Sequence, residues 1–98
     1  MCGAPVQTLD LEGIDVAKES IVQGTVVKDG APVAGAYVRL LDSTGEFTAE
    51  VQTSATGAFR FFAAPGDWTL RVLTPGGGST DAAATAALGE VAELTIEA

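Results

Sequence analysis

The chain has no histidine and a single cysteine, Cys2, among its 98 residues. Without histidine, catalytic triads of the Ser-His-Asp type, Cys-His nucleophile sites and sites for His-ligated zinc or haem are excluded. Because one cysteine cannot form a disulfide within the chain, the fold depends on packing alone, which favours a reducing compartment.

Basic residues and long apolar segments are also scarce. Five Lys and Arg stand against thirteen Asp and Glu, so the formal net charge is −8 and the isoelectric point is near 4.1. This charge repels nucleic acid and anionic bilayers, and no apolar run approaches the ~20 residues that cross a membrane. The N-terminus lacks the basic and apolar regions of a signal peptide. We therefore expect a cytoplasmic protein that binds neither nucleic acid nor a membrane.

The length suits one domain with one modest hydrophobic core. Residues 1–19 are weakly patterned and are interrupted by Pro5 and Gly13, which predicts an N-terminal arm. From Ser20 the sequence changes to short β-branched and aromatic runs separated by Gly, Pro, Asp and Ser. Residues 20–98 are therefore predicted to form the folded domain.

Six segments are predicted to be strands, because turn residues separate them at intervals of about ten residues. They are residues 20–28, 34–42, 46–53, 58–64, 67–74 and 90–97. The pair Asp29-Gly30 predicts a tight turn, since Gly adopts positive φ without steric cost. The Ala-rich residues 80–88 are expected to form a loose loop or one helical turn. The pattern predicts an all-β sandwich of about seven strands.

Alternation along each strand predicts the face that each side chain occupies. The side chains expected in the core are Val22, Val26, Val38, Leu40, Phe47, Val51, Phe59, Phe61, Trp68, Leu70, Val72, Leu94 and Ile96. Those expected on the solvent-exposed faces are Gln23, Thr25, Arg39, Arg60, Arg71, Glu46, Glu50, Glu93 and Glu97. Tyr37 and Phe62 also point outward, which predicts an exposed aromatic contact or cover by the N-terminal arm.

Several landmarks follow one another in a recognisable order. They are Gly24-Thr25-Val26-Val27, Pro32-Val33-Ala34-Gly35-Ala36, Thr56-Gly57-Ala58-Phe59-Arg60-Phe61 and Pro65-Gly66-Asp67-Trp68. In this order they resemble the transthyretin-like (prealbumin-like) sandwiches, including the regulatory-like domain of carboxypeptidases. The resemblance implies a Greek-key β-sandwich.

A closer resemblance covers nearly the whole chain. It is carried by Met1-Cys2, by residues 38–43 (VRLLDS), 46–51 (EFTAEV) and 59–66 (FRFFAAPG), and by Trp68-Thr69-Leu70-Arg71. These runs are similar to an actinobacterial family of unknown function that is sometimes labelled as the sulfur-metabolism protein SseC. The resemblance implies an association with rhodanese-type thiosulfate sulfurtransferases, and it implies no established activity.

Arg39, Arg60 and Arg71 are three of the five basic residues, and all three are predicted to point outward. If their strands are neighbours, they could form an anion site for sulfate or thiosulfate, or a docking patch for an acidic partner. The alternative is pairing across strands with the outward glutamates, which contributes about 0.2–1 kcal/mol per pair. The excess of acidic residues favours this alternative.

Cys2 becomes the N-terminal residue if Met1 is removed, and its free thiol could carry a persulfide, because the thiolate is the nucleophile. The alternative is an unreactive thiol, since no basic residue precedes Lys18 to lower its pKa. No metal or cofactor is expected. The acidic residues lack the spacing of a calcium loop, and Gly76-Gly77-Gly78 lacks the lysine of a phosphate-binding loop.

These observations favour a non-enzymatic accessory or binding protein. Its candidate partner is a rhodanese-type thiosulfate sulfurtransferase. One alternative is a sulfur carrier that uses Cys2, and another is a carbohydrate- or peptide-binding sandwich, although the inward position of Trp68 argues against a sugar platform. No catalytic or metal-binding residue is predicted. The candidate binding residues are Cys2, Tyr37, Arg39, Arg60 and Arg71.

Overall fold

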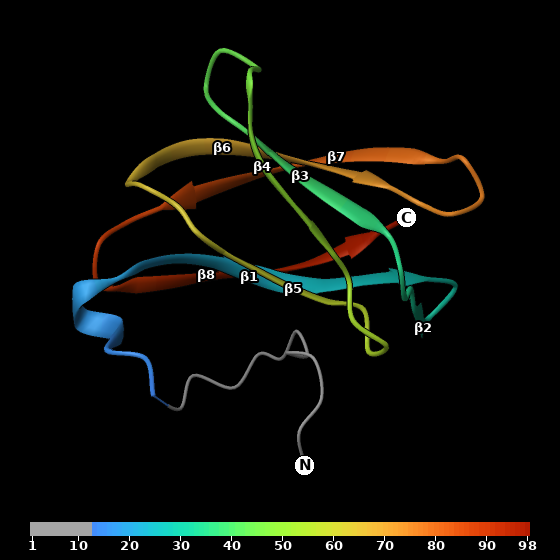
Figure 1. Cartoon of the computed structure of the whole chain (residues 1–98), viewed down its shortest axis with the longest axis horizontal. Coiled ribbons are helices and arrows are strands. Elements are labelled where there is room, and N and C mark those ends of the chain that lie inside the picture. The colour runs from blue at the N-terminus through green and yellow to red at the C-terminus, as the bar shows by residue number, and fades with distance from the viewer. Residues whose placement is uncertain (1–12) are drawn as a thin grey trace.

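The computed structural model describes residues 13–98, which form two facing β-sheets (Figure 1). The elements in this range are η1 (Val16–Lys18), β1 (Ser20–Lys28), β2 (Ala31–Pro32), β3 (Tyr37–Leu41), β4 (Phe47–Gln52), β5 (Ala58–Phe62), β6 (Gly66–Leu73), β7 (Ser79–Ala86) and β8 (Glu90–Glu97). The predicted all-β sandwich is confirmed. No helix in the described range has the length and apolarity that a membrane crossing requires.

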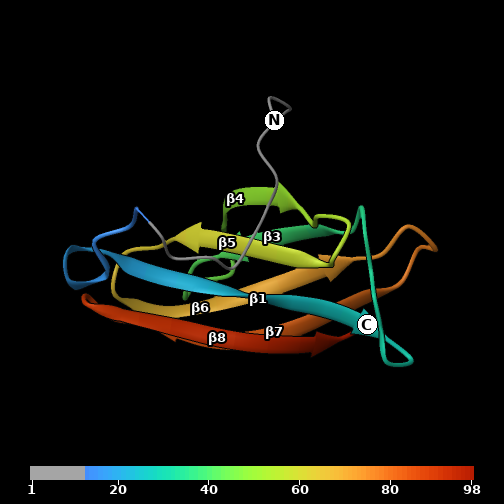
Figure 2. The same ribbon diagram turned by 90° about the horizontal axis from the view of Figure 1, so that it is seen from below.

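One sheet, sheet A, contains β1, β2, β5 and β8, and the other, sheet B, has the order β4-β3-β6-β7. In sheet A, β1 pairs antiparallel with β5 and β2 and parallel with β8 along the whole of β8. All pairs in sheet B are antiparallel. Figure 2 shows β7 and β8 along one edge of the sandwich, with β4 and β5 toward the other.

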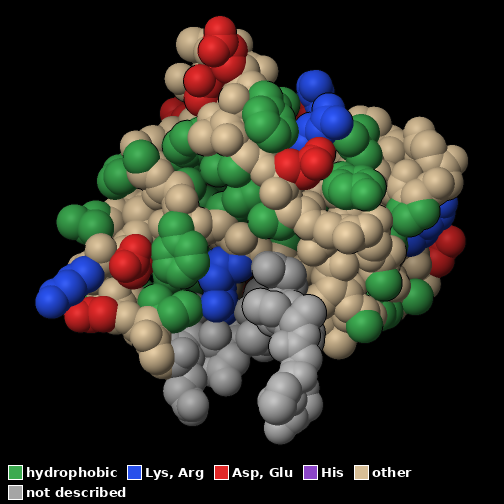
Figure 3. Space-filling view, in the orientation of Figure 1, with side chains coloured by type: hydrophobic (Ala, Val, Ile, Leu, Met, Phe, Trp, Pro, Cys, Tyr) green, Lys and Arg blue, Asp and Glu red, His purple; other side chains and the backbone are tan. Residues whose placement is uncertain are grey.

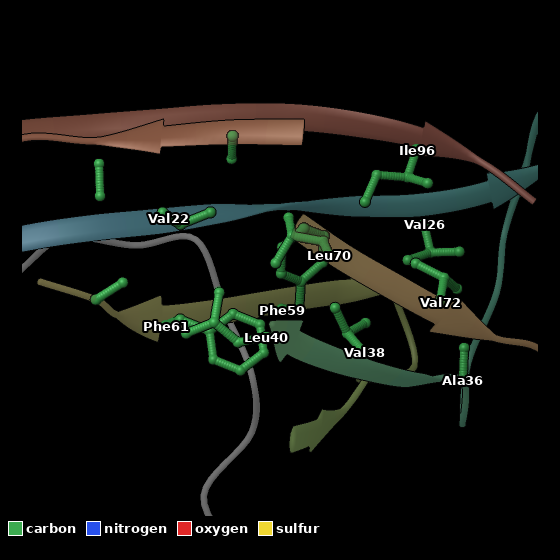
Figure 4. Close-up of a cluster of buried hydrophobic side chains, with 13 residues drawn as sticks. Val22, Val26, Ala36, Val38, Leu40, Phe59, Phe61, Leu70, Val72 and Ile96 are labelled. Carbon is green, nitrogen blue, oxygen red and sulfur yellow. The ribbon is translucent and has the colours of Figure 1, made fainter. Parts of the chain in front are cut away.

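The core lies between the two sheets and contains most of the side chains that alternation predicted (Figure 4). The confirmed members are Val22, Val26, Val38, Leu40, Phe59, Phe61, Leu70, Val72 and Ile96. Val51, Trp68 and Leu94 pack against this cluster and are half-buried. The indole N–H of Trp68 donates to the carbonyl of Ala64 at 2.8 Å, so its polar atom has a partner at the rim of the core.

The prediction of a loop or helical turn for residues 80–88 is wrong, because Ser79–Ala86 form β7. Alanine has a low preference for strands, but a neighbouring strand can override it. On the inner face, Trp68 pairs with Ala84 and Leu70 pairs with Ala82. Small side chains on β7 therefore fit beside the large ones on β6.

Phe47 was predicted to lie in the core, and this is also wrong, since 61% of the residue is exposed. The cause is a β-bulge. Leu40 pairs with Ala49 and Leu41 pairs with Phe47, so Thr48 is an extra residue on β4. One extra residue moves the next side chain to the opposite face of the sheet. Phe47 therefore points outward.

Gln23 was predicted to face solvent and is completely buried, which is a further correction. The period-2 pattern places it correctly on the outer face of sheet A but does not determine what covers that face. Its amide oxygen accepts a hydrogen bond from Arg60 Nε at 2.7 Å, and its amide nitrogen donates to Glu93 at 2.9 Å. Both ends of the buried amide are thus satisfied.

The Asp29-Gly30 pair forms the predicted tight turn between β1 and β2. Asp29 has φ of 52° and Gly30 has φ of 80°, the left-handed values that a two-residue hairpin turn needs at both central positions. Aspartate tolerates this conformation better than most residues other than glycine.

Asp42 organises the loop between β3 and β4. Its Oδ1 accepts hydrogen bonds from the hydroxyl of Thr44 at 2.6 Å, the backbone N–H of Thr44 at 2.9 Å and the backbone N–H of Glu46 at 3.0 Å. These bonds, the hydroxyl of Thr44 foremost, hold the pKa of Asp42 below its ordinary value. The folded protein therefore binds this proton less tightly than the unfolded chain does.

A carboxylate whose pKa is lowered by folding stabilises the protein above its unfolded pKa, and this stabilisation is lost as the pH falls through the folded pKa. We expect the melting temperature to decrease below about pH 4, and Asp42→Asn to flatten part of that decrease. The variant keeps an acceptor oxygen for the loop but cannot titrate. Thermal unfolding followed by circular dichroism across this pH range measures the slope, and equal slopes for both proteins would contradict the expectation.

Candidate functional site

Arg39 and Arg71 lie side by side on the outer face of sheet B, because β3 and β6 pair in a register that makes them direct partners. Like charges in this position destabilise a sheet unless other groups compensate them. An acid lies on the far side of each arginine, Glu50 on β4 and Asp81 on β7. The four side chains form one charged row, about 14 Å long, across all four strands.

Each arginine is hydrogen-bonded to its acid. Arg39 Nε donates to Glu50 Oε2 at 2.7 Å. Arg71 donates from Nε and Nη2 to the two oxygens of Asp81, at 2.9 and 3.0 Å. The pairing across strands expected for Arg39 with Glu50 is therefore present, and Arg71 has a partner that the sequence did not indicate. All four side chains are between 31% and 48% exposed, so solvent screens both pairs and each adds little to the stability of the fold.

The bidentate pair also sets the protonation of its members. The hydrogen bonds from Arg71 hold the pKa of Asp81 below its ordinary value, and Asp81 in turn raises the pKa of Arg71. Both groups are therefore charged at neutral pH. A carboxyl group with a lowered pKa is a poor proton donor, so Asp81 is suited to holding Arg71 in place and not to general acid catalysis.

Apolar side chains flank the charged row on both sides. Tyr37 shares a face with Arg39 and pairs with Leu73, whereas Phe47 pairs with Leu41 beyond the other side of the row. Tyr37 is 47% exposed and Phe47 is 61% exposed. Figure 3 shows hydrophobic side chains next to basic and acidic ones on the upper part of the molecule, where Figure 1 places sheet B. We call this surface the Arg39–Arg71 face, and its members are Tyr37, Arg39, Phe47, Glu50, Arg71 and Asp81.

Arg60 does not belong to this face. It lies on β5 in sheet A, the opposite layer of the sandwich, where it hydrogen-bonds to the buried amide of Gln23. A single anion site built from Arg39, Arg60 and Arg71 is therefore excluded. Among the candidate residues that lie within residues 13–98, only Tyr37, Arg39 and Arg71 come together.

Three members of the face were not among the candidates, and one of them, Glu50, was expected only as an outward pairing partner of the arginines. Phe47 was assigned to the core because a bulge leaves no mark in a two-residue periodicity. Asp81 was overlooked because its segment was predicted to be a loop. Cys2 lies outside the described residues, so the sulfur-carrier hypothesis stays a prediction. Within residues 13–98, no three His, Cys, Asp or Glu side chains gather closely enough to hold a metal ion.

The sequence matches the family described as "Protein of unknown function (DUF1416)" over residues 2–98, and the chain belongs to this family. Two relatives in Mycobacterium tuberculosis (strain ATCC 25618 / H37Rv), the uncharacterized proteins Rv0814c and Rv3118, are each 60% identical over 79 residues. This region is 79% of the chain and 79% of each relative. An uncharacterized protein of Mycolicibacterium smegmatis is 59% identical over 66 residues, which is 66% of the chain and 73% of that protein.

Some solved structures are similar to this chain in fold, with little identity in sequence. BcpA, the major pilin subunit of Bacillus cereus, aligns with a TM-score of 0.63 and 16% identity over 82% of this chain, which corresponds to 29% of the pilin chain. The dioxygenase domain of a dioxygenase and carbohydrate-binding fusion from Streptomyces sp. SirexAA-E aligns with a TM-score of 0.64 and 12% identity, over the whole of this chain and 95% of that one.

Proposed function

We propose that this member of the DUF1416 family is a non-enzymatic binding protein that docks a protein partner through the Arg39–Arg71 face. The observation that carries the proposal is the direct opposition of two of the five basic residues in an acidic chain, with an exposed aromatic side chain on either side. Glu50 and Asp81 compensate the like charges in the free protein, while the side chains of Arg39 and Arg71 stay 45% and 44% exposed and can meet a partner.

The composition of the face supports docking. Aromatic residues and arginine are enriched at protein interfaces, where they contribute most of the binding energy. Tyr37 and Phe47 can insert into pockets of a partner while the charged row fixes the orientation. The salt links to Glu50 and Asp81 hold the two arginines in extended, ordered positions, so less side-chain entropy is lost on binding.

The partner that we propose is a rhodanese-type thiosulfate sulfurtransferase. This choice depends on the resemblance of residues 46–51 and 59–66 to the family labelled with sulfur metabolism. The face adds a physical condition, because its two guanidinium groups require acidic groups opposite them on the contact surface of the partner. The location that we propose for this complex is the cytoplasm.

Binding of the purified sulfurtransferase from the same organism, measured by isothermal titration calorimetry, tests both parts of the proposal. We expect Arg39→Ala and Phe47→Ala each to weaken binding by about tenfold or more, the effect of truncating a side chain at the centre of an interface. The matched control is Phe62→Ala, because Phe62 is also an exposed aromatic, at 58%, but lies on sheet A. Its binding should equal that of the native protein.

Equal losses for Phe47→Ala and Phe62→Ala would show that the docking surface lies elsewhere. Absence of binding by the native protein would exclude this sulfurtransferase as the partner. Recovery of the complex only with an intact Cys2, accompanied by added sulfur mass on that residue, would replace docking with the carrier hypothesis.

A further inference from the structure

Strand β7 forms an outer edge of sheet B and pairs with β6 alone among the described strands. The pairing runs without a bulge from Ser79 to Ala86, opposite the whole of β6. A long, regular edge strand presents a row of backbone N–H and C=O groups to which another strand can bind.

The groups that point to this free edge can be identified. Thr74 N–H donates to the carbonyl of Gly78 at 2.9 Å, at the mouth of the turn between β6 and β7. Gly78 and Thr74 therefore form a hydrogen-bonded pair. Hydrogen-bonded and non-hydrogen-bonded pairs alternate along an antiparallel ladder, so the even-numbered residues of β7 bond to β6. The N–H and C=O groups that face outward from the sheet then belong to Ser79, Asp81, Ala83 and Thr85.

Two other outer strands, β8 and β4, carry features that oppose pairing, and the outer strands β2 and β5 are shorter, with two and five residues against the eight of β7. On β8, Glu90, Glu93 and Glu97 are exposed along the strand, and β4 is interrupted by its bulge. Charged side chains and bulges are the usual protection of sheet edges. β7 has neither feature, since its one charged side chain, Asp81, is neutralised by the bidentate pair with Arg71.

The sequence of β7 is complementary to itself. A twofold axis through Ala82 places Asp81 opposite Ala83 and Ser79 opposite Thr85, which brings the four outward residues of each strand into hydrogen-bonded register. Two copies then share about eight backbone hydrogen bonds. No two acids face each other, and every side chain at the junction is Ser, Thr, Asp or Ala, so none obstructs the approach of the partner strand.

We infer that β7 is the site at which a second copy of this chain binds, by antiparallel pairing of β7 with β7. The two copies of sheet B become one continuous sheet. The contact is a single strand pair, so the dimer belongs to the weak class of interfaces. Each copy carries a net charge of −8, so the two copies repel each other. Salt screens this repulsion, and association therefore becomes stronger as the salt concentration rises.

Sedimentation velocity of the full chain, with a reductant present to keep Cys2 from cross-linking, measures the dimer directly. From about 10 µM to about 1 mM we expect the dimer fraction to rise with protein concentration. At one protein concentration it should also rise between about 0.02 M and about 0.5 M NaCl. A monomer under all these conditions overturns pairing with a second copy.

Two glutamate variants locate the contact. In the dimer Ala83 lies opposite Asp81 of the second copy, so Ala83→Glu places like charges opposite each other, and we expect it to raise the dimer dissociation constant at least about tenfold. Thr95→Glu makes the same change of charge on the exposed face of β8, at the edge of the other sheet, and should leave the dimer unchanged or only slightly weaker. Equal weakening by both variants, or by neither, overturns the β7 site.

Amide hydrogen exchange of the native protein gives an independent measurement. At high protein concentration the amides of Ser79, Asp81, Ala83 and Thr85 should become protected, because only those groups acquire new partners. The amides of Ala82 and Ala84, which already bond to β6, should change little. Protection confined to other strands overturns the inference. Neither of the varied residues, Ala83 and Thr95, belongs to the Arg39–Arg71 face, so the proposed docking function is tested separately.

Discussion

Gly24→Ala is expected to destabilise the protein by at least about 3 kcal/mol, a large fraction of the stability of a domain this size. Gly24 lies in the middle of β1, between Leu94 of β8 and Phe59 of β5. A Cβ at this position would lie 2.0 Å from the carbonyl oxygen of Leu94 and 3.0 Å from the ring of Phe59. The nearest atom belongs to the backbone, so relief requires β1 and β8 to separate and lose part of their ladder.

Urea denaturation measures this effect, and Gly76→Ala is its matched control. A Cβ on Gly76 meets nothing within 4 Å. Its free energy of unfolding should therefore stay within about 0.5 kcal/mol of the native value. A Gly24→Ala protein that is as stable as the Gly76→Ala protein would show that the two strands can be spread apart at little cost.

Phe59→Ala should lower the free energy of unfolding by about 3–5 kcal/mol, because it removes a completely buried aromatic side chain and leaves a cavity between the sheets. Phe59 is the largest of the fully buried side chains in the described structure, and its ring contacts that of Phe61 with centroids 6.2 Å apart. The variant loses both the free energy gained by transferring the ring out of water and the packing contacts of the ring in the core.

Phe62→Ala is the control for this substitution, since it deletes the same atoms from the same strand. Phe62 is 58% exposed, and we expect its loss to cost no more than about 1 kcal/mol. Both variants are compared by urea denaturation, with the same dependence of the unfolding free energy on urea concentration assumed for each. Similar losses of stability for the two would indicate that the outer face of β5 is as tightly packed as the core.

Much of the sandwich was predictable because its strands obey local rules. Val22, Val26 and Ile96 lie in the core as two-residue alternation requires, and Asp29-Gly30 turns the chain where the dipeptide predicts it. These features depend only on neighbours in the sequence. The two misplaced elements depend on distant partners: β7 exists because β6 offers large side chains for its alanines, and Phe47 turns outward because of a bulge against β3.

Three of the six residues of the candidate site were predictable as candidates, but their grouping was not. Tyr37, Arg39 and Arg71 were assigned to outward faces by alternation, and all three are exposed. Their proximity depends on the pairing of β3 with β6, which passes over two intervening strands and has no signal in a single sequence. Arg60 is separated from the other two arginines because its strand, β5, belongs to the other sheet.

The parallel pairing of β1 with β8 has a consequence for how the chain folds. These two strands join the first and last parts of the domain, and the hydrogen bond from Gln23 to Glu93 spans 70 positions in the sequence. Closing so long a loop costs chain entropy before the contact repays it, which slows folding to the millisecond-to-second range of sandwich proteins. During synthesis, β1 can pair on that side only after β8 has emerged from the ribosome. Every strand of sheet B precedes β8 in the chain, so sheet A is the later of the two sheets to be completed.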